Sequence, residues 1–192
     1  MCIRDSYNGH PAVNNEGDDM HIDTETMWDL INIHYYNQNK PLIYGIATDD
    51  SHNYHTLSSE HSNTGRGWVM VKSQNLSPSN LILAMENGDF YASTGINLKT
   101  IFANKQKLFI EINPDENTNY EIIFMGYKKG TDEVVELKKV KGTSASYSYE
   151  KDDIFVRARI NSDTRKENPF MDQETEKAWT QPYLTQHNKA IN

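Results

Sequence analysis

The sequence predicts a chain of two parts, an α/β part followed by a small antiparallel β-sandwich. A segment with helical spacing starts at Asp23 and leads into a buried, strand-like run at Leu42 to Ala47, and a helix followed by a buried strand is the repeating unit of α/β folds. Later stretches are short, often alternate, and are separated by turn sequences, which is typical of sandwiches. We therefore place the α/β part at 7–96, the sandwich at 97–162 and a tail at 163–192.

The first predicted helix has clear start and stop signals. Asp23 or Thr24 can cap its start, and the step from Lys40 to Pro41 ends it. Residues at helical spacing supply its apolar face, with a histidine at the edge of the core: Met27, Leu30, Ile31 and His34.

The second predicted helix lies between two short strands, at Trp68 to Lys72 and Phe90 to Gly95. Ser77 is placed to cap it, and Pro78 suits the first helical position. Gly88 fits the residue just past its C-terminus, where a left-handed backbone is common.

The predicted sandwich has no clustered His, Asp or Glu at ligand spacing, so we expect it to be structural or to shape a substrate cleft. In the tail, Trp179 is expected to pack back onto the body. The expected sandwich strands are Leu108 to Ile112, Tyr120 to Tyr127, Val134 to Lys138, Ser144 to Tyr149 and Ile154 to Ile160.

Composition excludes several classes of protein. A formal charge of -8 and a pI of about 5.3 provide no basic field for a phosphate backbone, which argues against nucleic-acid binding but not against a phosphorylated small-molecule substrate. No apolar run approaches the roughly 20 residues that span a bilayer. We expect no signal peptide on this chain, although a lost N-terminus could have carried one. The single cysteine, Cys2, excludes an internal disulfide. The compartment and oligomeric state stay open.

The first six residues, Met1 to Ser6, resemble the in-frame translation of a transposase mosaic end used in sequencing adapters. We therefore expect them to be an artefact fused to a genuine reading frame that starts near Tyr7. On this hypothesis the chain is an N-terminally truncated fragment.

Asp50, Ser51 and His52 form the strongest candidate site, because they follow the predicted strand directly. Strand ends are where α/β folds place their chemistry, and alternate residues of an extended segment point the same way. A carboxylate and an imidazole together suit zinc, manganese or iron. The alternative is a solvated acidic turn in which Asp49 or Asp50 caps the following residues.

Five motifs follow one another along the chain: G-I-A-T-D-D-S-H, G-R-G-W-V-M-V, A-M-E-N-G-D-F-Y-A-S-T-G, F-V-R-A-R-I and A-W-T-Q-P. As an ordered set they resemble the C-terminal half of a PHP-domain (polymerase and histidinol phosphatase) metal-dependent phosphoesterase. The resemblance implies the C-terminal part of a distorted (β/α)7 barrel followed by the β-sandwich, and hydrolysis of a phosphate ester by metal-activated water. It assigns Asp50 to one divalent metal ion and His52 to a neighbouring one, with Asp49 shaping the turn.

The chain departs from the family pattern, because it contains no H-x-H motif and no counterpart of the middle Glu and His ligands. Two ligands cannot fill a multinuclear site, so we expect this chain alone to bind metal weakly and to be inactive. Two other functions stay open. The sandwich could serve a non-catalytic carbohydrate- or protein-binding module, or the scaffold could cleave a non-phosphate ester or amide.

Three further residues are candidates for binding substrate. Asn8 and His10 could line the cleft, although Asn8 and Gly9 equally suit a turn. Arg66, between two glycines, could reach a phosphate with its planar guanidinium; the alternative is a surface arginine in a mobile loop.

Overall fold

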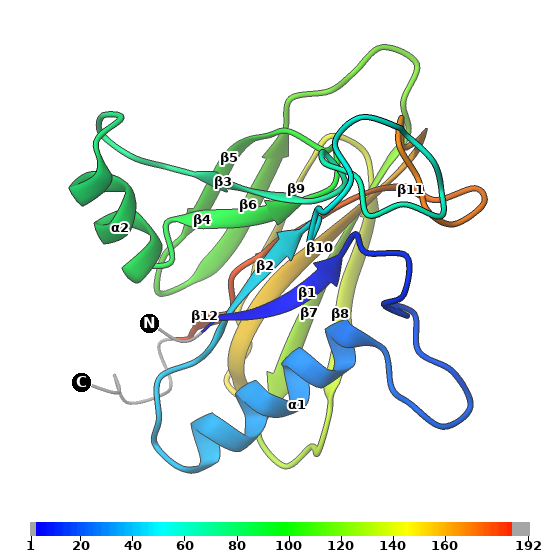
Figure 1. The fold of residues 1–192 in the computed structure, drawn as a ribbon. Helices are drawn as coiled ribbons and strands as arrows, with labels where there is room; N and C mark the ends of the chain where they lie inside the picture. Colours follow the sequence, from blue (N-terminus) through cyan, green and yellow to red (C-terminus); the bar gives the residue numbers. More distant parts are fainter. Residues whose placement is uncertain (1–2, 186–192) are drawn as a thin grey trace.

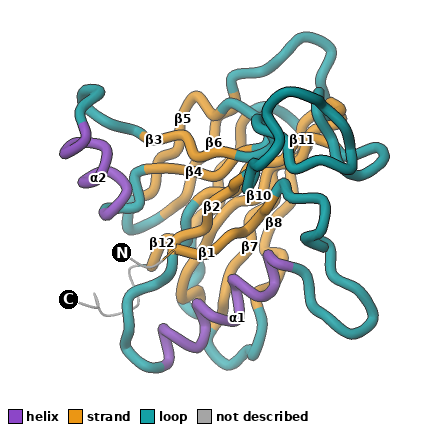
Figure 2. The backbone as a smooth tube through the Cα atoms, viewed as in Figure 1, coloured by secondary structure: helices purple, strands orange, loops and turns teal. Residues whose placement is uncertain are grey.

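The fold described by the computed structural model covers residues 3–185 and consists mainly of antiparallel β-sheet (Figure 1). Two residues of the adapter-like stretch, Met1 and Cys2, and residues 186–192 of the predicted tail lie outside this range. The strands occupy the middle of the molecule, and the two helices lie at its periphery (Figure 2). Neither helix of the described chain is long and apolar enough to cross a membrane.

A large sheet of seven strands forms the central layer, and its neighbouring strands all pair antiparallel. In spatial order the strands are β3 (Trp68–Val71), β4 (Phe90–Ser93), β11 (Thr175–Thr180), β10 (Asp153–Arg165), β7 (Tyr120–Lys128) and β8 (Val134–Lys141), with β12 (Tyr183–Leu184) also paired to β10.

A smaller sheet covers one face of the central layer. It consists of β5 (Leu98–Ala103), β6 (Lys107–Ile112) and β9 (Ser144–Ser148). Side chains from both sheets meet in one apolar cluster, whose fully buried members include Leu108, Ile110, Ile122, Phe124 and Ile160. This cluster is the core of a β-sandwich.

A βαβ unit covers the opposite face of the central layer. Strand β1 (Ile3–Asn8) pairs parallel with β2 (Tyr44–Thr48), and α1 (Thr24–Asn37) connects them. Alternation along the strands of the large sheet separates the two faces. Thus Tyr91 and Ala178 belong to the sandwich core, whereas Ala92 and Trp179 pack against the βαβ unit.

Helix α1 lies so close to β2 that one position requires glycine. The Trp28 side chain is completely buried, and its indole N–H donates to the Ile43 carbonyl at 2.8 Å. A Cβ atom at Gly45 would lie 2.7 Å from the Trp28 ring. The predicted N-terminus of this helix is confirmed, because the Asp23 side chain accepts a hydrogen bond from the Thr26 amide at 2.7 Å.

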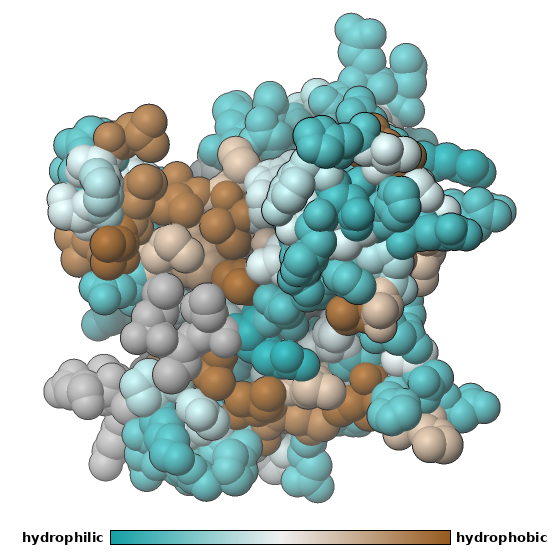
Figure 3. All heavy atoms as spheres, viewed as in Figure 1, coloured by the Kyte–Doolittle hydropathy of each residue, from teal (hydrophilic) through white to brown (hydrophobic). Residues whose placement is uncertain are grey.

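The second helix, α2 (Pro78–Glu86), also begins and ends as predicted, with Ser77 as its N-cap and Gly88 at a φ of 76°. It packs loosely, because Ile82 and Leu83 remain 58% and 55% exposed. Figure 3 shows apolar surface at the position of this helix.

The predicted (β/α)7 barrel is wrong for the described residues. After β2, the chain does not add another parallel strand. Instead β3 pairs antiparallel with β4, and β4 pairs with β11 from the predicted tail. The large sheet therefore runs across the boundary expected between residues 96 and 97. His34, expected at the edge of the core, is exposed.

A buried ion-pair network attaches α1 to the large sheet. Arg157 of β10 is 1% exposed, and its guanidinium contacts Asp29 at 2.5 and 2.8 Å and Glu25 at 2.7 Å. The guanidinium also lies 5.1 Å from the centre of the Trp28 ring. Glu25 in turn accepts from the Trp179 indole at 3.0 Å. One cation thus joins two carboxylates on the helix to the middle of the sheet.

Replacing Arg157 should strongly destabilise the fold. In Arg157→Met, Asp29 stays buried without its cation and Glu25 keeps only Arg159 at 3.3 Å, and breaking a buried pair in this way costs about 3–5 kcal/mol in comparable sites. Arg165→Met removes an exposed guanidinium from the same strand and should change stability by less than about 0.5 kcal/mol. Urea unfolding followed by tryptophan fluorescence measures both changes. A loss below about 1 kcal/mol in Arg157→Met would contradict the assigned role.

The same network should make stability depend on pH. Burial alone would raise the pKa of Glu25, but the guanidinium groups of Arg157 and Arg159 outweigh it and lower that pKa from 4.5 to about 2. A lowered pKa stabilises the folded state above the ordinary value, and this stabilisation is lost as the pH falls toward about 2. Urea midpoints at about pH 6 and pH 3 should therefore differ less in Glu25→Gln than in the unmodified protein.

Candidate functional site

The polar residues predicted to form a site gather at one edge of the βαβ unit. Because β1 and β2 are parallel, their carboxyl ends meet at this edge, where Asn8 lies opposite Thr48. The Gly9 amide continues the pairing by donating to the Thr48 carbonyl at 2.8 Å. His10 leaves this edge from β1, and the Asp49 to His52 segment leaves it from β2 (Figure 1).

The two aspartates after β2 have different roles. The Asp49 carboxylate accepts from the Gly65 amide at 2.8 Å and so closes the base of the 49–66 loop. Asp50 adopts a φ of 46°, a left-handed conformation that aspartate tolerates better than most residues. Its side chain is 48% exposed, so this carboxylate is available to a ligand.

His52 is held in one tautomer by the backbone. Its Nδ1 lies 2.7 Å from the Asp50 carbonyl oxygen, and a carbonyl can only accept, so Nδ1 carries the proton. In the neutral ring Nε2 then has a free lone pair. The Ser62 hydroxyl also donates to the Asp50 carbonyl. A backbone carbonyl that fixes one ring nitrogen is the usual support of a histidine that binds metal through the other nitrogen.

His10 has the opposite tautomer. The Ala12 amide donates to His10 Nδ1 at 3.1 Å, so the neutral ring carries its proton on Nε2. The rings of His10 and His52 meet edge to face, with their centres 6.0 Å apart. This edge therefore offers a lone pair from one imidazole and an N–H donor from the other, beside the Asp50 carboxylate.

The structure brings Asp50, His52 and His10 to one edge, but among the described residues their ligand atoms are not part of any group of three that lies within 4.8 Å of one another. Within residues 3–185, one group places three such ligand atoms within 4.8 Å of one another, and it is Glu150, Asp152 and Asp153, far from this edge in the fold. The Lys128 ammonium already lies among these three acids, 2.7, 3.4 and 2.9 Å from their carboxylates.

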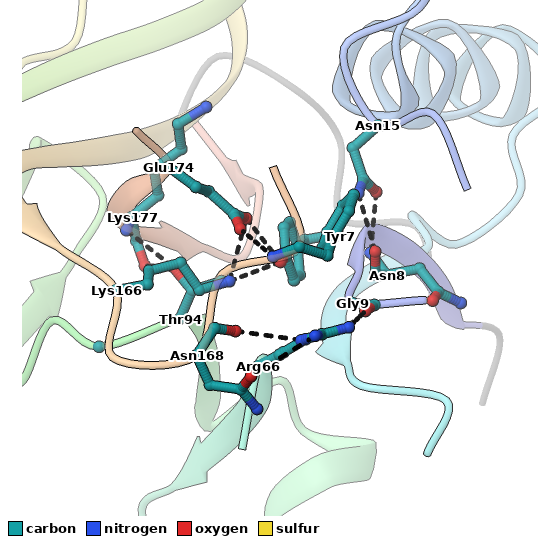
Figure 4. Close-up of polar contacts among 12 residues, drawn as sticks. Tyr7, Asn8, Gly9, Asn15, Arg66, Thr94, Lys166, Asn168, Glu174 and Lys177 are labelled. Carbon is teal, nitrogen blue, oxygen red and sulfur yellow. Dashed lines mark hydrogen bonds and ion pairs between the residues drawn. The ribbon is translucent and has the colours of Figure 1, made fainter. Parts of the chain in front are cut away.

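Arg66 does not have either position expected from the sequence. Its side chain is fully buried, so it is neither a surface residue nor exposed to a substrate. The guanidinium donates to the backbone carbonyls of Gly9 and Asn168 (Figure 4). It also donates to the carbonyls of Ser58 and His61. The phosphate-binding role proposed for this side chain is therefore corrected to an internal one.

Asn8 is used in the turn after β1. Its side-chain oxygen accepts from the His10 amide at 2.9 Å, and its amide group donates to Asp5 at 3.4 Å. Asn15 binds the Asn8 backbone on both sides, at 2.8 Å each (Figure 4). The turn alternative considered for Asn8 matches these contacts.

Sequence reasoning missed two residues that order this edge. Asn63 is completely buried, and its side chain binds the backbone of Asn53, Thr56 and Ser58, which fixes the path of the loop. Lys166 is buried against Tyr7 and Glu174. No pattern in the sequence distinguishes these side chains from solvated loop residues.

The two assigned tautomers lead to a direct spectroscopic prediction. In long-range proton–nitrogen correlation spectra near neutral pH, His52 should show a protonated Nδ1 and an unprotonated Nε2, and His10 the reverse. His21, an exposed histidine whose Nδ1 lies 2.8 Å from the Asp18 carboxylate, provides an internal reference away from this edge. Averaged signals from rapidly exchanging tautomers in both His10 and His52 would contradict the assignment.

Comparisons with known proteins give this chain no assignment, because no protein-family model, curated protein or solved structure matches it. The resemblance to PHP-domain enzymes therefore depends on the motifs alone. Any function has to be argued from the chemistry at the carboxyl ends of β1 and β2.

Proposed function

We propose that this chain contributes two ligands, Asp50 and His52, to the divalent metal centre of a phosphoesterase. The observation that supports the proposal most directly is the His52 ring, whose Nδ1 is engaged by the Asp50 carbonyl at 2.7 Å, leaving the Nε2 lone pair for a cation. Oxygen and nitrogen ligands of this kind suit zinc, manganese or iron.

The charges at the edge favour a bound cation. Asp49, Asp50 and His52 lie within four residues, and two carboxylates confined together repel each other unless a cation compensates them. The Asp49 carboxylate already accepts a hydrogen bond from the Gly65 amide, whereas the Asp50 side chain is 48% exposed. A positive ion beside Asp50 would therefore stabilise the arrangement.

The two ligands suit neighbouring cations better than a single one. The His52 nitrogen nearest to the Asp50 carboxylate is Nδ1, at 3.9 Å, and this nitrogen is already used by the backbone. Since Nε2 lies on the other side of the ring, the Asp50 carboxylate and the free Nε2 lone pair would bind two different, neighbouring cations. The proposal therefore places the remaining ligands outside the described residues.

The residues of this edge would divide the chemistry of phosphate-ester hydrolysis between them. When bound, divalent cations supply an activated water and neutralise charge on the phosphoryl oxygens. Asp50 and His52 hold these positions. The protonated Nε2 of His10 is suited to donate to a phosphoryl oxygen, because its Nδ1 is occupied by the Ala12 amide. The substrate class is a phosphorylated small molecule.

Metal binding should depend on both ligands. Titration of the chain with Mn²⁺ or Zn²⁺ by calorimetry should show weak binding that falls at least about 10-fold in Asp50→Ala and in His52→Ala, because loss of a residue that merely orients a ligand already costs about 10–100-fold in metal affinity. His21→Ala is the matched control and should leave the affinity unchanged. Unchanged affinity in both ligand variants would reject the site assignment.

Phosphatase activity is measured on the protein expressed from its natural gene. Hydrolysis of an aryl phosphate in the presence of Mn²⁺ should fall at least about 100-fold in Asp50→Ala and His52→Ala, because the cation supplies several kcal/mol of transition-state stabilisation. The matched control is again His21→Ala. Cleavage of a carboxylate ester or amide without phosphatase activity would favour another hydrolase, and retained phosphatase activity in both variants would contradict the proposal.

A further inference from the structure

One buried guanidinium connects both histidine-bearing segments of the carboxyl edge. Arg66 is 0% exposed and donates at 2.9 Å to the carbonyl of Gly9, directly before His10. It also donates to Ser58 and His61 in the loop that carries His52, at 2.9 and 2.7 Å. We propose that Arg66 is a positioning residue that sets the His10 and His52 rings relative to each other; the catalytic meaning of this role rests on the proposed function.

The loop transmits the position of these carbonyls to His52. The backbone amides of His52 and Asn53 both donate to the Ser62 carbonyl, at 3.0 and 2.9 Å. The 58–62 segment therefore holds the backbone of His52 through hydrogen bonds, and Arg66 donates to two carbonyls of that segment. A displacement of 58–62 would move the imidazole and its Asp50 contact together.

The other histidine is positioned by direct packing. A Cβ atom added at Gly9 would lie 2.5 Å from the Cβ of Arg66, so the chain leaving β1 lies immediately against the arginine. Gly9 precedes His10, whose amide is bound by the Asn8 side chain at 2.9 Å. The exit of β1 and the 49–66 loop thus contact the same side chain.

Lysine could not replace this arginine, because all five guanidinium N–H groups have acceptors. Nε donates to the Asn168 carbonyl at 3.0 Å, and the last Nη2 proton faces the Asn168 side-chain oxygen at 3.5 Å. The other three N–H groups bind Gly9, Ser58 and His61. An ammonium has three donors and no planar fork, so it can satisfy only part of this set.

The contact with Asn168 gives Arg66 a fixed reference in the large sheet. Asn168 lies in the connection between β10 and β11, which a buried group attaches to β1 (Figure 4). The Tyr7 hydroxyl donates to Glu174 at 2.6 Å, and the Lys166 ammonium lies 3.0 Å from the same carboxylate. Arg66 also lies over the Phe170 ring at 5.6 Å. Through Arg66, the β10–β11 connection of the large sheet therefore helps to fix the position of the carboxyl edge of β1 and β2.

The test uses Arg66→Lys, with Arg165→Lys as the matched exchange at an exposed position. Circular dichroism first establishes that both variants fold. Spectra of the metal-free proteins then report the tautomers of His10 and His52 and the nuclear Overhauser effects between their rings. We expect Arg66→Lys to lose the single His52 tautomer and the inter-ring effects, whereas Arg165→Lys keeps both.

The positioning role of Arg66 can fail independently of the proposed function, because these spectra are recorded without metal. A folded Arg66→Lys with unchanged tautomers and inter-ring effects would overturn the positioning role. If Arg66→Lys does not fold, Asn168→Ala and Asn168→Asp decide. Both variants lose the amide donor to the Thr64 carbonyl, and only Asn168→Asp keeps a side-chain acceptor for Arg66. His52 signals that change in Asn168→Ala and not in Asn168→Asp support the role, whereas signals that change alike in both variants, or in neither, reject it.

A calorimetric titration connects the role to the metal site. If the proposed function holds, Arg66→Lys should weaken Mn²⁺ binding about 10-fold without any change of ligand, the effect typical of residues that orient ligands. Absence of Mn²⁺ binding in the unmodified chain would count against the proposed function and leave the spectroscopic result on Arg66 unaffected.

Discussion

The rest of the structure depends on the buried contact between Arg157 and the two carboxylates of α1. Other contacts of the helix are the buried Trp28, Ile33 packed against Tyr127 and Phe155, and Asn32 bound to the Ile43 backbone, but none of these brings a charged group of the sheet to the helix. The pair is costly to desolvate, and it is stable here because both Asp29 oxygens and one Glu25 oxygen face the guanidinium. Since α1 links β1 to β2, its attachment to β10 also determines where the carboxyl edge of the parallel pair lies.

The edge itself is ordered by backbone carbonyls to an unusual degree. The Asp50 carbonyl sets the tautomer of His52, the Ser62 carbonyl holds the loop, and four carbonyls surround Arg66. A carbonyl is a weaker partner for a cation than a carboxylate, but it adds no net charge. Because backbone carbonyls accept the hydrogen bonds of Arg66, this arginine does not need the Asp50 carboxylate as a partner. The carboxylate therefore stays available to an external ion.

Local features were predictable from the sequence, and pairing between distant segments was not. The caps at Asp23 and Ser77 and the left-handed Gly88 depend on a few neighbouring residues, so the sequence predicts them correctly. The barrel prediction is wrong because β4 takes its second neighbour from residues 175–180, and no periodicity near β4 encodes that choice. The internal role of Arg66 was also hidden, since its acceptors are backbone atoms that any residue type provides.

The place of β11 in the large sheet has a consequence for how the chain folds. The strand lies between β4 and β10, so the chain must be synthesised through residue 180 before the two halves of the sheet can join. Contacts of such long sequence separation slow folding, because the connecting chain loses entropy before the contact forms. Until then the apolar residues of β4 and β10 lack their partner strand. During synthesis, β11 is therefore the element that ends the exposure of these strand edges to aggregation.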